Sequence, residues 1–292
     1  MEAAEMESVF TNAQRAEVLV QAMPNIQHYT GSIVVIKYGG NAMIHDALKQ
    51  QVMEDMGLLQ LIGVKVVLVH GGGPEITETM ARMGKESVFQ DGLRVTDRET
   101  VDIVQMVLAG KVNKSLVNLL EVKGGNAVGI SGMDGRLITA KMRDERLGYV
   151  GQVTKVNVRP ILDLLEKGYI PVVSTLGCDE TGNIYNINGD TAAAAIAGAL
   201  EARRLILMTD IDGILRNRED PSSLIPVMTV QEARELQTQG VISGGMIPKV
   251  ECCISAIEQG VKKVIILDGR VPHAILMELL TDQGAGTMVQ AR

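Results

Sequence analysis

The stretch Val66-Val67-Leu68-Val69-His70-Gly71-Gly72-Gly73-Pro74-Glu75 joins an apolar run to three glycines and a proline. The run is bounded, β-branched and too short for a helix, so it predicts a buried strand. Pro74 suits the first turn of a helix, and Ile76, Met80 and Met83 follow at helical spacing. Glycines at this junction let backbone approach a ligand closely, and the free N–H groups of a helix start favour an anion.

The same pattern occurs earlier in the chain. Ile33-Val34-Val35-Ile36-Lys37 is a second apolar run, followed by Tyr38-Gly39-Gly40-Asn41, and it ends on a lysine rather than a histidine. Two glycine-rich strand ends, one of them carrying a cation, predict a phosphate cradle. Glycines after strands are also ordinary turns, so either loop alone leaves the function open.

Composition excludes several classes of function. A length of 292 residues allows a sizeable core and two lobes. The formal net charge of −7 argues against a nucleic-acid partner, and two Phe, five Tyr and no Trp offer few surfaces for base stacking. The chain shows no apolar run of membrane-spanning length and no secretory signal, so we expect no membrane partner.

The three cysteines, Cys178, Cys252 and Cys253, show no CxxC spacing, and the chain has no HExxH motif. A zinc site therefore has little support, and we expect no protein-bound metal. An odd number of cysteines without a disulfide framework fits a reducing compartment. We expect a cytoplasmic protein, or a plastid protein after removal of a transit peptide if the source is a plant or alga.

An N-terminal arm, residues 1–30, precedes the first predicted strand. Residues 4–22 predict an amphipathic helix, with Val9, Ala13, Ala16 and Val20 toward one face, and Pro24 is expected to end it. This helix has no obvious place in an α/β core. It either packs on its own subunit or pairs with another subunit.

Strand and helix patterns alternate along the rest of the chain, which predicts a three-layer αβα sandwich with a mainly parallel central sheet. The change of motifs near 176–178 divides it into an N-lobe, 31–176, and a C-lobe, 177–292. Residues 136–156 predict a hairpin or ribbon, and Asp97 is expected to cap the helix that follows it, whose apolar side carries Val101, Val104, Met106 and Leu108. Predicted strands lie at 33–37, 65–70, 127–130, 169–174, 204–208, 263–267 and 287–290, and predicted helices lie at 46–62, after Pro74, at 97–109, 111–122, 158–167, 191–201, 229–239, near 249–259 and at 272–280.

Three familiar motifs are absent. Walker A spacing does not occur, which excludes an ordinary P-loop NTPase. The dinucleotide fingerprint fails because Ile76 stands where the third glycine is required. His70-Gly71-Gly72-Gly73 is similar to an esterase oxyanion loop, but the chain has no GxSxG, so a hydrolase has weak support.

Five stretches together resemble the amino acid kinase family, which includes the carbamate kinases, and they imply its fold. They are Val35–Gly40, His70–Pro74, Asp91–Thr96, Asn186–Asp190 and Gly244–Lys249, in order within residues 30–292. The Asp-Gly-Leu-Arg-Val-Thr and Gly-Met-Ile-Pro-Lys blocks are specific in combination. The likeness is greatest to the branch that phosphorylates the side-chain carboxylate of N-acetyl-L-glutamate with MgATP, giving an acyl phosphate and ADP in arginine biosynthesis.

The resemblance implies three catalytic residues. Lys37 would contact the transferring phosphoryl group, Lys249 would stabilise charge toward the leaving ADP, and Asp190 would orient both lysines. A lysine is a compact charge suited to phosphate, although most lysines are solvated surface residues. Asp190 need not be a base, because a carboxylate nucleophile is already ionised at neutral pH. Asp190 could also cap helix 191–201, a structural role that is compatible with orienting the lysines.

The acceptor, a dicarboxylate with an acetamido group, would bind in the N-lobe. A guanidinium holds a carboxylate with its two-pronged fork, although Arg94 could instead form a surface ion pair with Asp91 or Asp97. Asn186 can bond to both a carboxylate and an amide. The resemblance assigns substrate binding to Gly72, Gly73, Arg94 and Asn186.

ATP would bind in the C-lobe. The amides of Gly40 and Gly72 would donate to the γ-phosphoryl oxygens, as in an oxyanion hole. Mg²⁺ is expected to be carried on the ATP phosphates with water, because no cluster of carboxylates offers a full cage. The chain departs from the family in having Asn188-Gly189-Asp190 where Asn-Ala-Asp is common, and glycine adds backbone freedom next to Asp190. The nucleotide- and phosphate-binding set is Gly39, Gly40, Thr209, Asp210, Gly213, Gly244 and Met246.

The two ends of the chain resemble arginine-inhibited members of the family. In those members N-terminal helices interlace dimers into a hexamer, a trimer of dimers, and L-arginine binds near that helix and a C-terminal block. The matching block implies His273, Glu278 and Gly284 as arginine contacts, while His273 could instead cap or pack locally. The sequence of residues 244–254 also resembles members from photosynthetic organisms that bind a PII signalling protein. We expect this partner only if the source is photosynthetic.

Three hypotheses follow. The first is a hexameric, arginine-inhibited kinase of N-acetyl-L-glutamate. The second keeps the fold and changes the acceptor to carbamate, aspartate, glutamate or UMP, and the setting of Arg94 favours the acetylated dicarboxylate. The third is a non-catalytic arginine sensor, against which the joint presence of Lys37, Asp190 and Lys249 argues.

Overall fold

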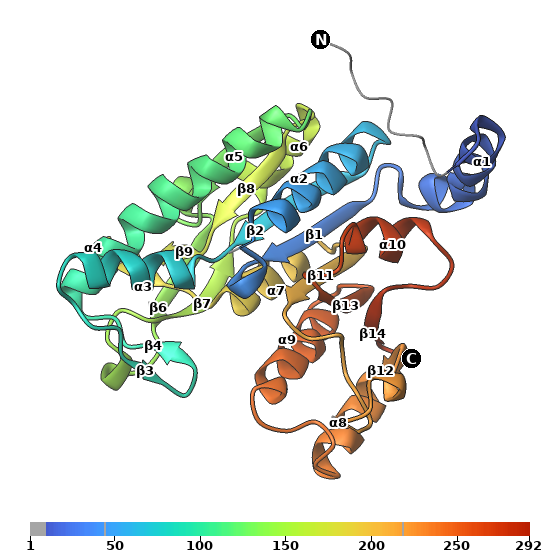
Figure 1. Cartoon of the computed structure of the whole chain (residues 1–292). Helices are drawn as coiled ribbons and strands as arrows, with labels where there is room; N and C mark the ends of the chain where they lie inside the picture. The colour runs from blue at the N-terminus through green and yellow to red at the C-terminus, as the bar shows by residue number, and fades with distance from the viewer. Residues whose placement is uncertain (1–9, 44, 218) are drawn as a thin grey trace.

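The apolar run after residue 32 forms the inner strand β1 of an eight-stranded sheet (Figure 1). The computed structural model describes residues 10–43, 45–217 and 219–292. Strand order is β12-β14-β13-β11-β1-β2-β8-β5, and pairing is parallel except between β13 and β14. The prediction of a mainly parallel central sheet is confirmed. Its strands are β1 (Ile33–Tyr38), β2 (Lys65–His70), β5 (Ala127–Ser131), β8 (Ile170–Ser174), β11 (Arg204–Thr209), β12 (Val227–Thr229), β13 (Lys263–Asp268) and β14 (Gly286–Gln290).

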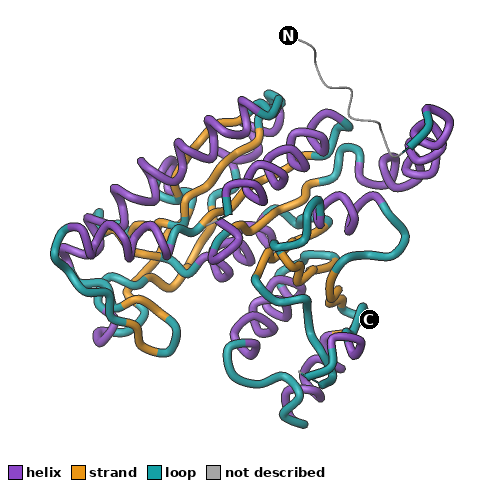
Figure 2. Tube along the Cα trace, viewed as in Figure 1, coloured by secondary structure: helices purple, strands orange, loops and turns teal. Residues whose placement is uncertain are grey.

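Helices cover both faces of this sheet and complete the predicted three layers (Figures 1 and 2). Alternate residues of β1 point to opposite faces: Val35 packs into a core with α6–α9, and Ile36 packs into a second core with α2–α5 and α10. In the described part of the chain no helix is long and apolar enough to cross a bilayer. The helices are α1 (Asn12–Tyr29), α2 (Asp46–Leu61), α3 (Gly73–Arg82), α4 (Arg98–Gln105), α5 (Asn113–Val122), α6 (Arg159–Glu166), α7 (Gly189–Ala199), α8 (Val230–Thr238), α9 (Met246–Glu258) and α10 (Ala274–Leu280).

Two smaller sheets flank the large one. β6 (Ile138–Met142) and β7 (Gly151–Val156) form the predicted antiparallel ribbon, and β9 (Leu176–Cys178) and β10 (Ile184–Asn186) extend it in the order β10-β9-β6-β7. Strands from both sides of the predicted lobe boundary therefore share this sheet, and the boundary itself stays a prediction. The third sheet is the hairpin of β3 (Phe89–Gln90) and β4 (Leu93–Arg94).

The helices expected at 97–109 and 111–122 are joined into one. α4 runs directly into a π-helix (Met106–Val112), which runs directly into α5. Asp97 caps α4 as predicted, accepting from the Thr100 N–H. The expectation that Met106 faces the core is wrong, since Met106 is 58% exposed. A π-turn holds more residues than an α-turn, so the helical phase shifts at this point.

The prediction that Pro24 ends the N-terminal helix is also wrong. α1 continues through Pro24 to Tyr29, and Thr11 with Gln14 forms a capping box at its start. Proline removes one backbone donor, and the carbonyl of Val20 that loses this bond lies on an exposed stretch that water can reach. Figure 1 shows α1 projecting beside α10, which it contacts. The predicted residues 4–9, Val9 among them, lie outside the described residues.

Candidate active site

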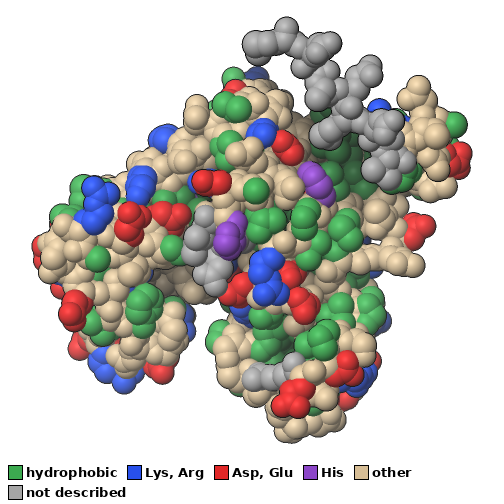
Figure 3. All heavy atoms as spheres, viewed as in Figure 1, with side chains coloured by type: hydrophobic (Ala, Val, Ile, Leu, Met, Phe, Trp, Pro, Cys, Tyr) green, Lys and Arg blue, Asp and Glu red, His purple; other side chains and the backbone are tan. Residues whose placement is uncertain are grey.

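The carboxyl ends of six parallel strands meet at one edge of the large sheet. Open α/β sheets bind ligands at this edge, where the strand order reverses, and β1 occupies that position with β2 on one side and β11 on the other. In the space-filling view the surface is hollowed between the part that carries β3–β4 and the part that carries α8 and α9 (Figure 3). Buried polar side chains end several of these strands: His70, Ser131, Ser174, Thr209 and Asp268.

Asp190 joins the two predicted catalytic lysines. Its Oδ1 lies 2.8 Å from Lys37 Nζ, and its Oδ2 lies 3.2 Å from Lys249 Nζ. The three side chains come from the end of β1 and from the first turns of α7 and α9. Burial alone would raise the pKa of Asp190, but the two lysine charges outweigh it and lower the pKa to about 2. The carboxylate is therefore ionised and holds both ammonium groups in place.

The alternative that Asp190 caps α7 is wrong. α7 begins at Gly189, and the cap is Asn188, whose side chain accepts from the Thr191 N–H at 3.1 Å. The Asp190 carboxylate is left for the lysines. A Cβ at Gly189 would lie 3.2 Å from Lys37 Cε, tighter than an ordinary van der Waals contact, so the glycine leaves room for Lys37 beside Asp190.

A small pocket of about 150 Å³ lies beside this cluster. The structure brings together here all four residues predicted to bind the acceptor, although they come from α3, the β3–β4 hairpin and β10. Asn186 donates from Nδ2 to Thr96 Oγ1 at 3.3 Å. Besides Gly72, Gly73, Arg94 and Asn186, the pocket is lined by Gly71, Ile76, Phe89, Gly92, Leu93, Leu108, Val150, Thr175, Ile187, Asn188 and Gly189.

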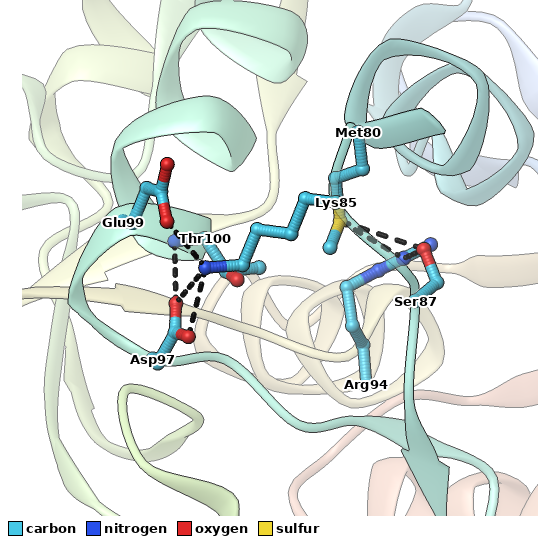
Figure 4. Close-up of polar contacts among 7 residues, drawn as sticks. All are labelled: Met80, Lys85, Ser87, Arg94, Asp97, Glu99 and Thr100. Atoms are coloured by element: carbon cyan, nitrogen blue, oxygen red, sulfur yellow. Dashed lines mark hydrogen bonds and ion pairs between the residues drawn. The ribbon is translucent and has the colours of Figure 1, made fainter. Parts of the chain in front are cut away.

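Arg94 is only 6% exposed, and its hydrogen-bond partners among the described residues are all neutral; Figure 4 shows two of them, Met80 and Ser87. It donates to the Gly73 carbonyl at 2.9 Å, to Thr77 Oγ1 at 2.8 Å and to Ser87 Oγ. Its guanidinium also lies over the Phe89 ring, 4.7 Å from the centroid. Burial lowers the pKa of Arg94, yet arginine keeps its charge. The surface ion pair considered for Arg94 is not formed: within the described residues no carboxylate pairs with it.

Lys85 pins the base of the β3–β4 hairpin (Figure 4). Its Nζ lies 2.8 Å from Asp97 Oδ2 and 2.7 Å from Glu99 Oε2, at the start of α4. The residues before and after the hairpin are thus held side by side. Asp97, one of the two ion-pair partners considered for Arg94, is engaged here instead. Sequence reasoning missed this support and the roles of Thr77 and Ser87.

Two glycine loops meet at the strand ends, where the Gly71 N–H donates to the Tyr38 carbonyl at 3.1 Å. A Cβ at Gly72 would lie 2.7 Å from Leu108 Cδ2 and 3.2 Å from Val112 Cγ2, so any other residue here would force these π-helix side chains to move. Gly40 has a φ of 68°, which also favours glycine. Gly39 lies beside the ammonium group of Lys37: a Cβ at Gly39 would be 3.5 Å from Lys37 Nζ.

A larger pocket of about 620 Å³ has Lys249 in its wall, together with residues 210–215, 241–242 and 245–246. Among the predicted nucleotide residues, Asp210, Gly213 and Met246 line it. Thr209 and Gly244 are chain neighbours of lining residues rather than part of the wall. Among the lining residues that sequence reasoning missed are two charged ones that pair with each other: Arg270 Nη2 lies 3.0 Å from Asp212 Oδ1. A signal was available in the sequence, because Asp212 lies three residues after the end of β11 and Arg270 two residues after the end of β13.

The three expected arginine contacts divide into two places. Glu278 is buried and accepts from the Ala285 N–H at 2.8 Å, and a Cβ at Gly284 would lie 2.8 Å from Glu278 Oε2, so these two residues are neighbours. His273 occupies the cap position of α10, but its side chain does not cap the helix. Its Nδ1 lies 2.6 Å from Asp55 Oδ1 on α2.

Comparison with known proteins gives a consistent result. The sequence model described as "Amino acid kinase family" matches residues 32–268. The chain is 51% identical to the acetylglutamate kinase of Nostoc sp., over 95% of this chain and 94% of that protein. It is 50% identical to the acetylglutamate kinase of Clostridium beijerinckii, over 96% and 100% respectively. Among solved structures, N-acetylglutamate synthase from Neisseria gonorrhoeae, complexed with coenzyme A and N-acetyl-glutamate, is similar with a TM-score of 0.83 and 26% identity, covering 95% of this chain and 63% of that one.

Proposed function

The chain belongs to the amino acid kinase family, and we propose that it transfers the γ-phosphoryl group of ATP to the side-chain carboxylate of N-acetyl-L-glutamate. The products are N-acetylglutamyl 5-phosphate and ADP, a step of arginine biosynthesis. The observation that carries the proposal is the cluster of Lys37, Asp190 and Lys249. It lies between a larger pocket and a small pocket whose buried Arg94 guanidinium has no carboxylate partner among the described residues. The choice of acceptor is supported by the similarity to acetylglutamate kinases, two of which are 51% and 50% identical to this chain.

The proposed mechanism relies on alignment and charge. The acceptor carboxylate is already a nucleophile, so no residue has to remove a proton. Lys37 contacts the transferring phosphoryl group, and Lys249 stabilises the charge that develops toward ADP, as phosphoryl transfer requires. Asp190 spaces the two ammonium groups, 2.8 and 3.2 Å from its oxygens. The Gly40 and Gly72 amides donate to the phosphoryl oxygens.

In the proposed acceptor site, Arg94 binds the carboxylate that does not react. Its charge is buried and faces only neutral acceptors, so an incoming carboxylate gains a charge-assisted, two-pronged contact. Asn186 contacts the acetylated amino group and its neighbouring carboxylate. Gly72 and Gly73 bring backbone close to the substrate.

The proposed nucleotide site is the larger pocket. Thr209, Asp210, Gly213, Gly244 and Met246 lie in or next to its wall, and Gly39 and Gly40 belong to the phosphate end. Magnesium is proposed to be carried on the ATP phosphates, where a divalent cation neutralises charge. Over the described ranges, no group of three or more His, Cys, Asp and Glu side chains is arranged to hold a metal ion, so that stretch of the chain offers no separate cage.

Regulation and assembly form a second part of the proposal. The buried carboxylate of Glu278, next to Gly284, is a partner for the guanidinium of L-arginine, with His273 on the same C-terminal segment. The exposed apolar side chains of α1 support pairing with another subunit in a hexamer. A cytoplasmic location, and a PII partner in a photosynthetic source, belong to the same proposal and rest on the sequence resemblance.

The test is ADP release with MgATP and a panel of acceptors: N-acetyl-L-glutamate, L-glutamate, L-aspartate, carbamate and UMP. N-acetyl-L-glutamate should give the highest kcat/KM, and Lys37→Met and Lys249→Met should abolish turnover while the protein stays folded. Lys141→Met is the matched control, because Lys141 is exposed on β6. A higher kcat/KM with another acceptor would contradict the proposal. A titration with L-arginine in the same assay tests the feedback inhibition.

A further inference from the structure

His70 is a buried titratable residue that the proposed mechanism does not use. It ends β2, directly before the glycine loop, and is fully buried. Its Nδ1 lies 2.8 Å from the Gly71 carbonyl oxygen, and its Nε2 lies 3.1 Å from Asn113 Nδ2. Burial lowers the pKa of His70 to about 4, so the imidazole is neutral at physiological pH.

The surroundings define which nitrogen carries the proton. A carbonyl oxygen only accepts, so Nδ1 must donate to Gly71, and Nε2 must accept from Asn113. The orientation of the Asn113 amide agrees: its Nδ2 shares its two hydrogens among His70 Nε2, the Val172 carbonyl at 2.9 Å and the Ile130 carbonyl at 3.2 Å, and its Oδ1 accepts from Lys114 Nζ at 3.1 Å. His70 is therefore the Nδ1–H tautomer.

The bond to Gly71 determines the direction of the next amide. The Gly71 carbonyl and the Gly72 N–H belong to one planar trans peptide, in which the two groups point in opposite directions. The Gly71 N–H is already used by the Tyr38 carbonyl. A carbonyl held toward His70 leaves the Gly72 N–H pointing away from the imidazole. Gly71, Gly72 and Gly73 line the acceptor pocket, while His70 does not.

We propose that His70 is a positioning residue for phosphoryl transfer: its Nδ1–H holds the Gly71 carbonyl and so aims the Gly72 N–H at the transferring phosphoryl group. The inference rests on the proposed function, in which the Gly72 amide is a donor. Rotation of this peptide would misdirect that donor, and loss of one preorganised donor costs about 10²–10³-fold in kcat.

Two amide substitutions separate the two ring nitrogens. In His70→Asn the side-chain NH₂ stands near the position of Nδ1 and can still donate to Gly71, but it does not reach Asn113. In His70→Gln the amide stands near the position of Nε2, so it reaches Asn113 and leaves Gly71 without its donor. Both variants are neutral, so charge does not differ between them.

We expect His70→Asn to keep most of the wild-type kcat, and His70→Gln to lose about 10²-fold in kcat with little change in the KM for ATP. A role limited to core stability would make activity follow thermal stability in both variants, irrespective of which nitrogen is replaced. Equal kcat values, or a more active His70→Gln, would overturn the inference.

A spectroscopic measurement decides the case if neither variant folds. The wild-type chain has four histidines. Solid-state NMR of protein labelled with ¹⁵N-histidine should show His70 as a neutral, Nδ1-protonated ring. Its signal is assigned by its loss in any soluble variant or by its distance to the Gly71 carbonyl carbon. An Nε2-protonated ring would overturn the inference. If the wild type turns over another acceptor, the proposed substrate fails, and the order of the two variants is then measured on that acceptor.

Discussion

Arg94 carries a full charge into a site where only 6% of the residue remains exposed. A charge buried this deeply is costly unless it is hydrogen-bonded or paired. Gly73, Thr77 and Ser87 supply hydrogen bonds, but none supplies a negative charge. The carboxylate of the proposed acceptor supplies that charge, which is a reason for an arginine rather than a neutral donor at this position.

Replacement of Arg94 by lysine tests this reading. Lysine keeps the charge and loses the planar fork that bonds a carboxylate with two parallel N–H groups. We expect the KM for N-acetyl-L-glutamate to rise by about 10- to 100-fold, the scale of a lost hydrogen bond to a charged group, with an unchanged KM for ATP. Steady-state kinetics with each substrate varied in turn measures both constants. A rise confined to ATP would contradict this assignment.

Asp55 is a second buried charge, on α2 and 1% exposed. Burial raises its pKa to about 6, although the hydrogen bond and charge of His273 and a bond from the Leu276 backbone lower it, and Glu54 adds a small rise. Its Oδ2 has no hydrogen-bond partner among the described residues. The folded protein therefore binds a proton at Asp55 more tightly than the unfolded chain does.

The stability of the protein should depend on pH because the pKa of Asp55 differs between the folded and unfolded states. Because the folded pKa is raised, the stabilisation from Asp55 is complete below about pH 4 and is lost as pH rises through about 6. The asparagine in Asp55→Asn does not titrate. The free energy of unfolding of this variant, measured relative to that of the wild type, should therefore increase between pH 4 and 7, by at most about 3 kcal/mol. Urea unfolding across this range measures the difference. A difference that stays constant with pH would contradict the prediction.

The π-helix between α4 and α5 is the element that shapes the glycine loop. Its Leu108 and Val112 side chains reach the Cα of Gly72, at 2.7 and 3.2 Å from the place of a Cβ. A regular α-helix would present different residues at these positions, because each π-turn takes an additional residue. The element thus favours glycine at a position where the proposed function also places close contact between substrate and backbone.

Gly72→Ala should reduce kcat strongly and lower stability by about 1–3 kcal/mol, the usual cost of overpacking. The double variant Gly72→Ala with Leu108→Ala removes the clashing methyl groups and should recover part of the lost activity. Gly110→Ala is a matched control in the same π-helix, since a Cβ there meets no atom within 4 Å. ADP release and thermal unfolding measure the series. A double variant no better than the single variant would point to a different cause.

At the scale of the whole molecule, one sheet connects the small pocket lined by Arg94 to the larger pocket lined by Lys249, with β1 between the strands of the two parts. The N-terminal helix stands apart from this unit. Its residues 12–21 are exposed, while its C-terminal end contacts α10 and packs His28 and Tyr29 against Arg203 and Arg204. The exposed side chains of α1 include large apolar ones, Val18, Leu19, Val20 and Met23, at 57, 67, 59 and 50% exposure.

A second copy of the chain is the proposed cover for this surface. Truncation to residues 24–292 should reduce a hexamer to dimers, measured by size-exclusion chromatography with light scattering, and should leave kcat without arginine near the wild-type value. Glu17→Gln, on the same exposed helix, is the control and should leave the assembly unchanged. If the truncated protein kept the same assembly, the hypothesis that α1 pairs with another subunit would be contradicted.

Sequence alone determined the features that depend on neighbouring residues. Strands such as β1 and β2 were predicted almost to the residue, because a short β-branched run between turn residues has few other structures to adopt. Asp97 was recognised as a cap for the same local reason. Lys37, Asp190 and Lys249 were found as candidates through their motifs, and the structure brings them together.

Tertiary structure decided the features that depend on distant contacts. Pro24 remains inside a helix because its lost bond faces water, and the π-turn at residues 106–112 packs Leu108 and Val112 against Gly72 of the glycine loop. Arg94 has no carboxylate partner within the described residues because Thr77, Ser87 and the Gly73 carbonyl surround it. The local sequence does not contain these contacts, which arise only when strands and helices far apart in the chain are packed against one sheet.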